Sequence, residues 1–412
     1  MRKLSTQCMD DLEKKVKKIF NFSIKILCLL IPLFAIFLFG GCAFDKENEE
    51  NSINVYSWGE FIANGTDGNI NVNKEFTKRT GIKVNYKTFQ NNEELFAKLV
   101  GGGADYDVII PSDYMISRLI ENDMLAPLNF DNIPSYNLID EKFKNLNFDP
   151  QNKYSVPYMW GLIGIFYNKK EVSIPESEIN WDILWETKYK NKILMFDNAR
   201  DSFAISLLRL GYSLNTTEPS NWREAADELI KQKPLVQAYV MDQIFDKMAN
   251  GEAVLAPYYA GDAATLIKNN PDIGFVIPKS GTNKFVDSMC IPKNSKHKAL
   301  AEKYINFMCE TDISLANLKQ TGYSTPQKEA YEMLSDDIKQ NKIFYPDNDI
   351  MEKSDVFVNL PENINKLMDE LWIEVKSGGA YSPEWMLVII LLMFVLIYLG
   401  VLMYKKFKIK AK

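Results

Sequence analysis

The chain contains 412 residues, of which 46% are hydrophobic and 25% are charged, and its formal net charge is −6. This size and composition are typical of one or two globular domains. The negative charge argues against a nucleic-acid partner. The single histidine, His297, argues against a histidine-based metal site and a Ser-His-Asp triad. No G-x-x-x-x-G-K-[ST] motif occurs either. We expect no metal and no cofactor.

Residues 1–42 are expected to be a targeting segment of the lipoprotein type rather than part of the fold. A lysine-rich region precedes a short apolar core, and Gly40-Gly41-Cys42 follows it. Small residues before a cysteine are similar to the bacterial lipoprotein signal, so Cys42 is the predicted lipidation site. An uncleaved membrane anchor is the alternative. Residues 43–52 are polar and acidic, which is typical of a flexible tether.

The C-terminal region predicts one transmembrane helix. Residues 386–404 form an apolar run that is long enough to span a bilayer. Five lysines lie in the tail 405–412, which places that tail in the cytoplasm. The globular part is then expected on the extracytoplasmic face of a bacterial cell membrane, held by the Cys42 lipid, by this helix, or by both. A buried core helix is the alternative for 386–404.

Between these ends, apolar strand patterns alternate with helical patterns. Strands are expected at 53–56, 82–86 and 108–110, and helices at 72–80, 92–100 and 115–121. This βαβαβα order is typical of a parallel sheet covered by helices. Two further strands, 154–160 and 164–167, are expected to cross between two lobes, and 181–189 is expected to be a short helix. Cys290 and Cys309 are expected to be buried thiols rather than a disulfide.

Aromatic and acidic residues recur together where the predicted strands end. The groups are Trp58 with Glu60, Asp113 with Tyr114, Asp197 with Asp201, and Tyr258 and Tyr259 with Asp262; Phe285 with Asp287, and Tyr323, add two more. A flexible ligand with several ammonium groups needs carboxylates for its charges and aromatic walls for its methylenes. Each group taken alone also has a structural interpretation.

The globular region, about 53–376, resembles the spermidine/putrescine-binding proteins of bacterial ABC importers. The matching stretches are 56–60 (YSWGE), 80–84 (TGIKV), 106–114 (YDVIIPSDY), 154–161 (YSVPYMWG), 197–201 (DNARD), 210–213 (LGYS) and 321–326 (TGYSTP). The resemblance implies a two-lobed α/β periplasmic-binding-protein-like fold of type II with hinge strands, which closes on its ligand. Lobe 1 is expected to comprise 53–161 and 286–330, and lobe 2 to comprise 162–285 and 331–376.

The resemblance also implies a set of ligand-binding residues. Trp58, Tyr259 and Tyr323 match aromatic residues that line the site. Asp201, Asp287 and Glu60 match its acids. The full expected set is Trp58, Glu60, Phe61, Ser112, Tyr114, Asp197, Asp201, Tyr259, Phe285, Asp287 and Tyr323.

Some positions depart from the family pattern. Phe61 and Phe285 stand where some relatives have Tyr and Trp, and Met241 stands where some have Ser. Asn198 stands where some have an acid, which Asp197 could replace. The lost acid favours putrescine over the longer spermidine.

The resemblance implies a binding protein and not an enzyme. It would capture a polyamine and deliver it to ABC permease subunits and their cytoplasmic ATPase. A second hypothesis is a ferric-ion-binding or other cation-binding importer protein, because Tyr258-Tyr259 is similar to the tyrosine pair of ferric-ion binders. A third is an extracytoplasmic enzyme that uses Asp197 and Asp201, and a fourth is a membrane-tethered polyamine sensor.

Overall fold

The computed structural model describes residues 51–66, 68–102 and 105–378. The chain divides into two units, residues 1–52 and 53–412, and almost every described residue belongs to the second. The predicted targeting segment with Cys42, nearly all of the tether, and the predicted span 386–404 with its tail lie outside the described residues. Within the described ranges, no helix combines the length and apolar character needed to cross a membrane.

The nine strands of the described residues form one continuous hydrogen-bonded sheet, which β4 divides into a first and a second sheet. The first sheet follows the βαβαβα order that the sequence predicts. Its strands, in spatial order, are β2 (Lys83–Phe89), β1 (Ser52–Trp58), β3 (Val108–Ile109), β9 (Lys284–Cys290) and the first half of β4 (Ser155–Asn168). β1 and β3 are parallel, whereas β9 runs antiparallel to β3. Three helices connect or follow the first strands: α2 (Val72–Thr80), α3 (Asn92–Val100) and α4 (Asp113–Glu121).

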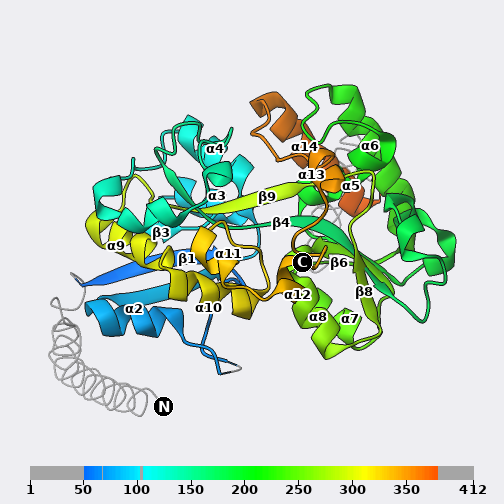
Figure 1. Cartoon of the computed structure of the whole chain (residues 1–412). Coiled ribbons are helices and arrows are strands. Elements are labelled where there is room, and N and C mark those ends of the chain that lie inside the picture. The colour runs from blue at the N-terminus through cyan, green and yellow to red at the C-terminus, as the bar shows by residue number, and fades with distance from the viewer. Residues whose placement is uncertain (1–50, 67, 103–104, 379–412) are drawn as a thin grey trace, which may run out of the picture. The chain divides into compact units, whose positions relative to one another are not determined.

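The second sheet contains the other half of β4. Its remaining strands are β7 (Leu255–Tyr259), β5 (Ile193–Phe196), β6 (Val236–Val240) and β8 (Ile273–Val276). The helices between these strands are α5 (Ala199–Leu210), α6 (Pro219–Gln232), α7 (Ile244–Ala249) and α8 (Ala263–Asn269). The two sheets and their helices form the two α/β lobes that the sequence predicts, with β4 and β9 between them (Figure 1).

One prediction about the crossing strands is wrong. The sequence predicts two strands, 154–160 and 164–167, but β4 is continuous from Ser155 to Asn168. Residues 155–162 pair with β9, and residues 163–168 pair with β7 and β8. The glycines that interrupt the apolar pattern make room for rings. A Cβ on Gly161 would lie 2.8 Å from the Phe285 ring, and one on Gly164 would lie 2.4 Å from the Phe275 ring.

A second correction concerns the expected helix 181–189. The structure has two short 3-10 helices there, η6 (Trp181–Trp185) and η7 (Thr187–Tyr189), because Glu186 between them is extended (φ −75°, ψ 122°). The remaining 3-10 helices are η2 (Phe130–Asn132), η3 (Pro134–Leu138), η4 (Glu141–Phe143), η5 (Glu176–Glu178), η8 (Lys233–Leu235) and η9 (Ala260–Asp262). The prediction of two free, buried cysteines, Cys290 and Cys309, is confirmed.

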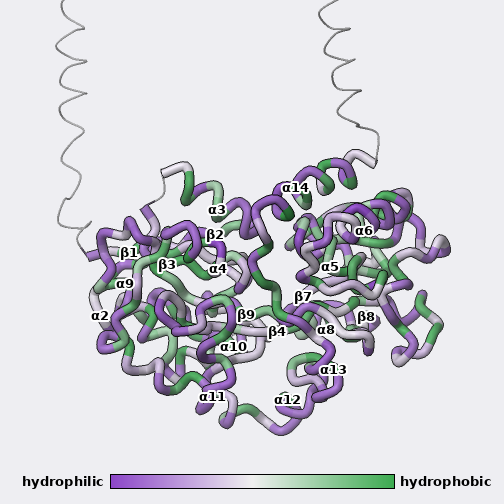
Figure 2. Tube along the Cα trace, turned by 90° about the horizontal axis from the view of Figure 1, so that it is seen from above, coloured by the Kyte–Doolittle hydropathy of each residue, from purple (hydrophilic) through white to green (hydrophobic). Residues whose placement is uncertain are grey.

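The C-terminal part of the described chain returns to both lobes. α9 (Lys298–Met308) and α10 (Thr311–Thr321) are followed by α11 (Lys328–Glu332), α12 (Asp336–Lys339), α13 (Asn348–Glu352) and α14 (Glu362–Ser377). α14 packs mainly on α6. Its buried residues, Ile364, Met368, Leu371 and Val375, recur every three or four positions, which places them on one face of the helix. The hydrophilic and hydrophobic residues alternate accordingly along α14 in Figure 2.

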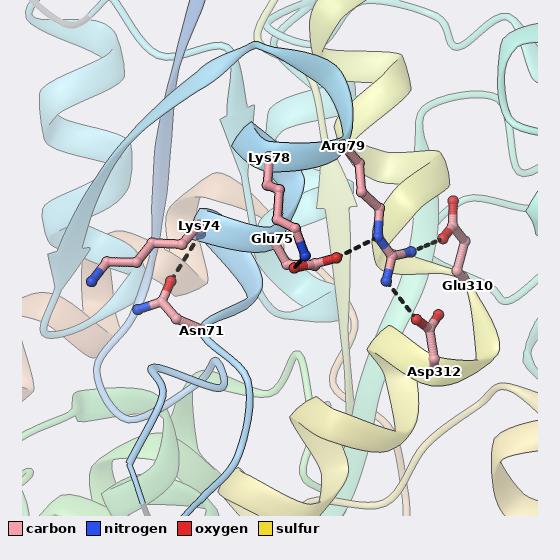
Figure 3. A network of polar contacts seen from close by, with 7 residues as sticks. All are labelled: Asn71, Lys74, Glu75, Lys78, Arg79, Glu310 and Asp312. Carbon is pink, nitrogen blue, oxygen red and sulfur yellow. Dashed lines mark hydrogen bonds and ion pairs between the residues drawn. The ribbon is translucent and has the colours of Figure 1, made fainter.

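A polar network around Arg79 ties α2 to the start of α10 (Figure 3). The Arg79 guanidinium donates to Glu75 Oε1 (2.9 Å), Glu310 Oε2 (2.9 Å) and Asp312 Oδ2 (2.7 Å). It also lies 5.3 Å from the centre of the Phe307 ring. One side chain therefore joins segments that are distant in the sequence.

We expect Arg79→Ala to lower the free energy of unfolding by roughly 1 kcal/mol, because it removes three partly exposed ion pairs and the packing on Phe307. Denaturant titration of the full chain measures this loss. Lys78→Ala is the matched control. Lys78 pairs with Glu75 within α2, and its side chain is 77% exposed. An equal loss in both variants would contradict a specific role for Arg79.

Candidate ligand-binding site

A cleft between the two sheets brings together ten of the eleven predicted site residues. They are Trp58, Glu60, Phe61, Ser112, Tyr114, Asp201, Tyr259, Phe285, Asp287 and Tyr323. The space between the lining side chains is about 710 Å³, its open mouth included. Segments from β1, α4, α5, β7 and β9 reach this cleft, in agreement with the rule that α/β sheets bind ligands beyond their strand ends.

The end of β1 supplies one wall. The Trp58 ring lies 4.6 Å from the ring of Phe89, centre to centre, and its indole Nε1 is buried without a hydrogen-bond partner of normal geometry. Phe61 is buried, and its carbonyl accepts a hydrogen bond from the Tyr158 hydroxyl (2.8 Å). Between them the chain turns sharply: Glu60 adopts φ 45°, in the left-handed region, and its side chain is exposed at the cleft.

Asp201 and Asp287 are the two most deeply placed carboxylates of the predicted set. Asp201 lies in the first turn of α5, is 5% exposed, and accepts a hydrogen bond from the Tyr259 hydroxyl (2.8 Å). Asp287 lies within β9, is 4% exposed, and its Oδ1 has no hydrogen-bond partner. Burial raises the pKa of each to about 7. A buried carboxylate oxygen without a hydrogen-bond donor is unfavourable. Asp287 Oδ1 is therefore suited to accept a hydrogen bond from a ligand.

A third buried carboxylate, Asp262, lies on η9 after β7. It accepts a hydrogen bond from the Tyr323 hydroxyl (2.8 Å). Burial raises its pKa to about 8, and the negative charges of Asp242 and Glu60 add to the rise. The close approach depends on glycine, because a Cβ on Gly261 would lie 2.3 Å from the Tyr323 ring.

Aromatic rings separate these acids. Phe285 contacts Tyr259 at 5.4 Å and Tyr323 at 6.1 Å, centre to centre, and Phe61 contacts Tyr323 at 5.0 Å. All three contacts are edge-on, an arrangement that favours a rigid aromatic surface. The cleft therefore presents apolar ring surfaces between its carboxylates.

The first sheet contributes polar groups through α4. Ser112 precedes the helix, and its backbone N–H donates to Asn92 Oδ1 (3.3 Å). The Tyr114 hydroxyl donates to Glu93 Oε1 (3.0 Å), and burial raises the pKa of both Tyr114 and Glu93. Hydrogen bonding by the Ser112 side chain lowers the pKa of Asp287 and so partly opposes the rise that burial causes.

Asp197 is the one predicted site residue that does not line the cleft. Its carboxylate pairs with Lys376 of α14, and its side chain is about half exposed. Asn198 lines the cleft instead and serves as the N-cap of α5, where its Oδ1 accepts a hydrogen bond from the Asp201 backbone N–H. The direction of the chain at this cap turns the preceding side chain towards α14, so Asp197 does not replace the acid that Asn198 lacks.

Several lining residues are absent from the predicted set. Asp242 follows β6, a strand not predicted from the sequence, and Phe357 lies in the segment between α13 and α14. Neither has a neighbouring motif that signals a binding role. Asp262 and Tyr258 belong to a strand-end group that the sequence does show, so the recurrence of acids and aromatics was the available signal. The other lining residues outside the set are Gly59, Phe89, Gln90, Asn92, Asn198, Met241, Phe245 and Asn283.

The charge of the lining is one-sided. Five acids, Glu60, Asp201, Asp242, Asp262 and Asp287, face the cleft, and none of the described lining residues is Lys or Arg. Arg200 is a buried cation that neighbours Asp201 in α5, but its guanidinium donates to Asn215 Oδ1 (2.9 Å) and to the Val358 carbonyl (3.3 Å). Within the described residues, no group of three or more His, Cys, Asp or Glu side chains is placed to hold a metal ion.

Comparison with known proteins shows the family to which this chain belongs. Residues 71–346 match the bacterial extracellular solute-binding proteins. The spermidine/putrescine-binding periplasmic protein of Salmonella typhimurium is 33% identical over 333 residues, which cover 80% of this chain and 93% of that protein. The putrescine-binding periplasmic protein PotF of Escherichia coli is 29% identical over 348 residues, covering 80% and 92%.

A solved structure agrees with these sequence matches. The putative spermidine/putrescine ABC transporter from Listeria monocytogenes has a TM-score of 0.75 and 38% identity, and the match covers 79% of this chain and 99% of that one. The predicted resemblance and the two-lobed fold are thereby confirmed. The chain belongs to the bacterial extracellular solute-binding proteins of ABC importers, a family of binding proteins rather than enzymes, and within it resembles the polyamine-binding members.

Proposed function

We propose that this protein captures a polyamine, putrescine or spermidine, in its cleft and delivers it to an ABC permease. The observation that carries this proposal is the lining itself: five carboxylates, no Lys or Arg among the described lining residues, and aromatic rings between the acids. Ammonium groups satisfy the carboxylates, and methylene segments pack on the rings. The names of the relatives support the same ligand class.

The ionisation of the buried acids fits a cationic ligand. Asp201 and Asp287 have pKa values of about 7, and that of Asp262 is about 8, because burial disfavours their charged forms. An ammonium group that enters the cleft offsets this cost, whereas an anionic ligand would add to it. The same acids therefore select for cations and against carboxylate-bearing solutes.

Closure of the two lobes around the ligand is part of the proposal. We assign 53–161 and 286–330 to lobe 1, and 162–285 and 331–376 to lobe 2, joined by hinge strands as in a type II binding protein. The pairing of β4 supports this division, because β4 changes its partner from β9 to β7 between residues 162 and 163, next to the proposed boundary. Hinge bending at β4 and β9 would open and close the cleft while each sheet stays intact.

Attachment to the membrane is a separate part of the proposal and rests on the sequence. The Gly40-Gly41-Cys42 stretch supports lipidation at Cys42, and the apolar run 386–404 with its lysine-rich tail supports a single span. Either device would hold the binding protein beside its permease. If the span instead transmits ligand occupancy, the protein acts as a tethered sensor, and deletion of 383–412 would then abolish signalling while leaving ligand binding intact.

Isothermal titration of the purified full chain with putrescine, spermidine and butylamine tests the proposed ligand class. Butylamine has the same carbon chain as putrescine but a single ammonium group. We expect saturable binding of putrescine or spermidine and none of butylamine at the same concentrations, because one ammonium group cannot satisfy carboxylates at both ends. Equal binding of butylamine would overturn the proposal.

An iron-dependent absorbance band of the purified protein would instead support the ferric-ion hypothesis, with Tyr258 and Tyr259 as ligands.

A further inference from the structure

The carboxylates of the cleft fall into two groups at different depths. Asp201 and Asp287 form the inner pair. Both are buried, and the negative charge of Asp201 raises the pKa of Asp287. Asp242 and Glu60 are exposed residues that also line the cleft, so they lie at its mouth. The negative charges of both residues raise the pKa of the buried Asp262. The acids therefore extend from the interior of the cleft to its opening.

Asp242 reaches its place by crossing the cleft. It follows β6 of the second sheet, yet its carboxylate lies against Gly59, which follows β1 of the first sheet. A Cβ on Gly59 would lie 2.7 Å from Asp242 Oδ2, so the absence of a side chain at this position permits the approach. The other oxygen, Oδ1, accepts a hydrogen bond from the Tyr258 hydroxyl (3.4 Å).

Adjacent tyrosines at the end of β7 connect the mouth to the inner pair. The Tyr259 hydroxyl donates to Asp201 of the inner pair (2.8 Å), and the Tyr258 hydroxyl donates to Asp242. The two rings lie 4.9 Å apart, centre to centre. A ligand that lies along these rings has Asp201 at one end and Asp242 at the other. Whether it reaches both carboxylates depends on its length.

We propose that Asp242 is a specificity-determining residue that pairs with the terminal ammonium group of a triamine at the mouth of the cleft. This inference rests on the proposed polyamine-binding function. A diamine whose ammonium groups are held by the buried carboxylates gains little from Asp242, whereas a longer amine extends to it. Asp242 thereby restores at the mouth the acid that is lost at Asn198, and the cleft favours spermidine over putrescine, in contrast to the expectation from Asn198 alone.

The test compares Asp242→Asn with wild type and with Asp246→Asn, all as full chains, in titrations with spermidine and putrescine at about 0.15 M salt. Asp246 is an exposed acid on α7, a short distance further along the chain, and is not among the residues that line the cleft. We expect Asp242→Asn to weaken spermidine binding by roughly 5- to 20-fold and putrescine binding by less than about 2-fold, because an ammonium–carboxylate pair at a partly exposed site is lost. Asp246→Asn should change neither.

The outcomes separate this inference from the proposed function. Wild-type protein that binds neither amine overturns both. Wild-type binding of either amine, with an Asp242→Asn variant that loses affinity for both amines equally or for neither, overturns the role of Asp242 and leaves polyamine capture standing. Asp242→Glu keeps the charge and should retain spermidine affinity within about 3-fold; a loss as large as that of Asp242→Asn would show that shape, not charge, matters at this position.

Discussion

Replacing Asp287 by Asn should lower polyamine affinity by roughly 100- to 1,000-fold, because it removes one partner of a buried ion pair. Asp287 is 4% exposed, and its Oδ1 lacks a hydrogen-bond partner in the free cleft. An amide at this position would present N–H groups to an ammonium ligand. The free protein should be at least as stable as wild type, because the variant no longer buries an ionisable group whose Oδ1 has no hydrogen-bond partner. Calorimetric titration and thermal unfolding measure the two effects.

Asp113→Asn is the contrasting control. Asp113 is fully buried, but its oxygens accept hydrogen bonds from the backbone N–H groups of Tyr114 (2.7 Å) and Val286 (3.3 Å). Its carboxylate serves the fold, so the variant should lose roughly 1–3 kcal/mol of stability. A comparable loss of stability in Asp287→Asn, or a loss of affinity below about tenfold, would contradict the assignment of Asp287 as a ligand-binding group.

Polyamine affinity is expected to rise with pH between about 6 and 8, and binding should release protons. The free cleft holds Asp201 and Asp287 with pKa values of about 7, and Asp262 with a pKa of about 8. An ammonium ligand favours their ionised forms and lowers these pKa values. A group with a pKa near 7 that must ionise for binding changes affinity roughly tenfold between pH 6 and 8, so two such groups produce a large combined effect.

Titrations near neutral pH in two buffers with different ionisation enthalpies count the protons released. Other charged groups face these acids: Arg200 opposes the rise in the pKa of Asp201, and Glu93 adds to it. Asp287→Asn should reduce the proton count and flatten the pH dependence. An affinity that is constant across this pH range, with no difference between buffers, would contradict this linkage.

The stability of the free protein should change with pH in the opposite direction. Because the folded pKa values of these acids lie above their unfolded values, the folded state binds more protons than the unfolded chain between about pH 4 and 8. The free energy of unfolding therefore falls as pH rises through this window. A saturating polyamine should remove most of this fall, since the ligand supplies the counter-charge. Denaturant titrations with and without ligand check both statements.

The order of strands and helices could be predicted because local patterns dictate it. Gly81 ends α2 in a left-handed conformation (φ 76°), and Asn71 and Asn91 cap the starts of α2 and α3. The continuity of β4 could not be predicted, because the reason for Gly161 and Gly164 is the position of two rings distant in sequence. Local signals describe where an element starts and ends, but not which side chain fills the space beside it.

The binding site was predictable to the extent that its residues lie in recurring strand-end groups. Asp201, Tyr259 and Asp287 each lie in such a group and do line the cleft. Asp197 belongs to the same group as Asp201 but pairs with Lys376, whose position in α14 depends on tertiary packing. Asp242 and Phe357 lie outside any such group and reach the cleft through the arrangement of distant segments. Convergence of this kind is not encoded in short stretches of sequence.

The continuity of β4 also bears on how the protein unfolds. One uninterrupted strand supplies hydrogen bonds to β9 in the first sheet and to β7 and β8 in the second. If one sheet loses its structure, the other loses the support of a shared central strand. We therefore expect the two lobes to unfold in a single cooperative transition, although each has its own helices. A ligand bound between them should then protect both from denaturation, and we expect the slowest amide hydrogen exchange in β4.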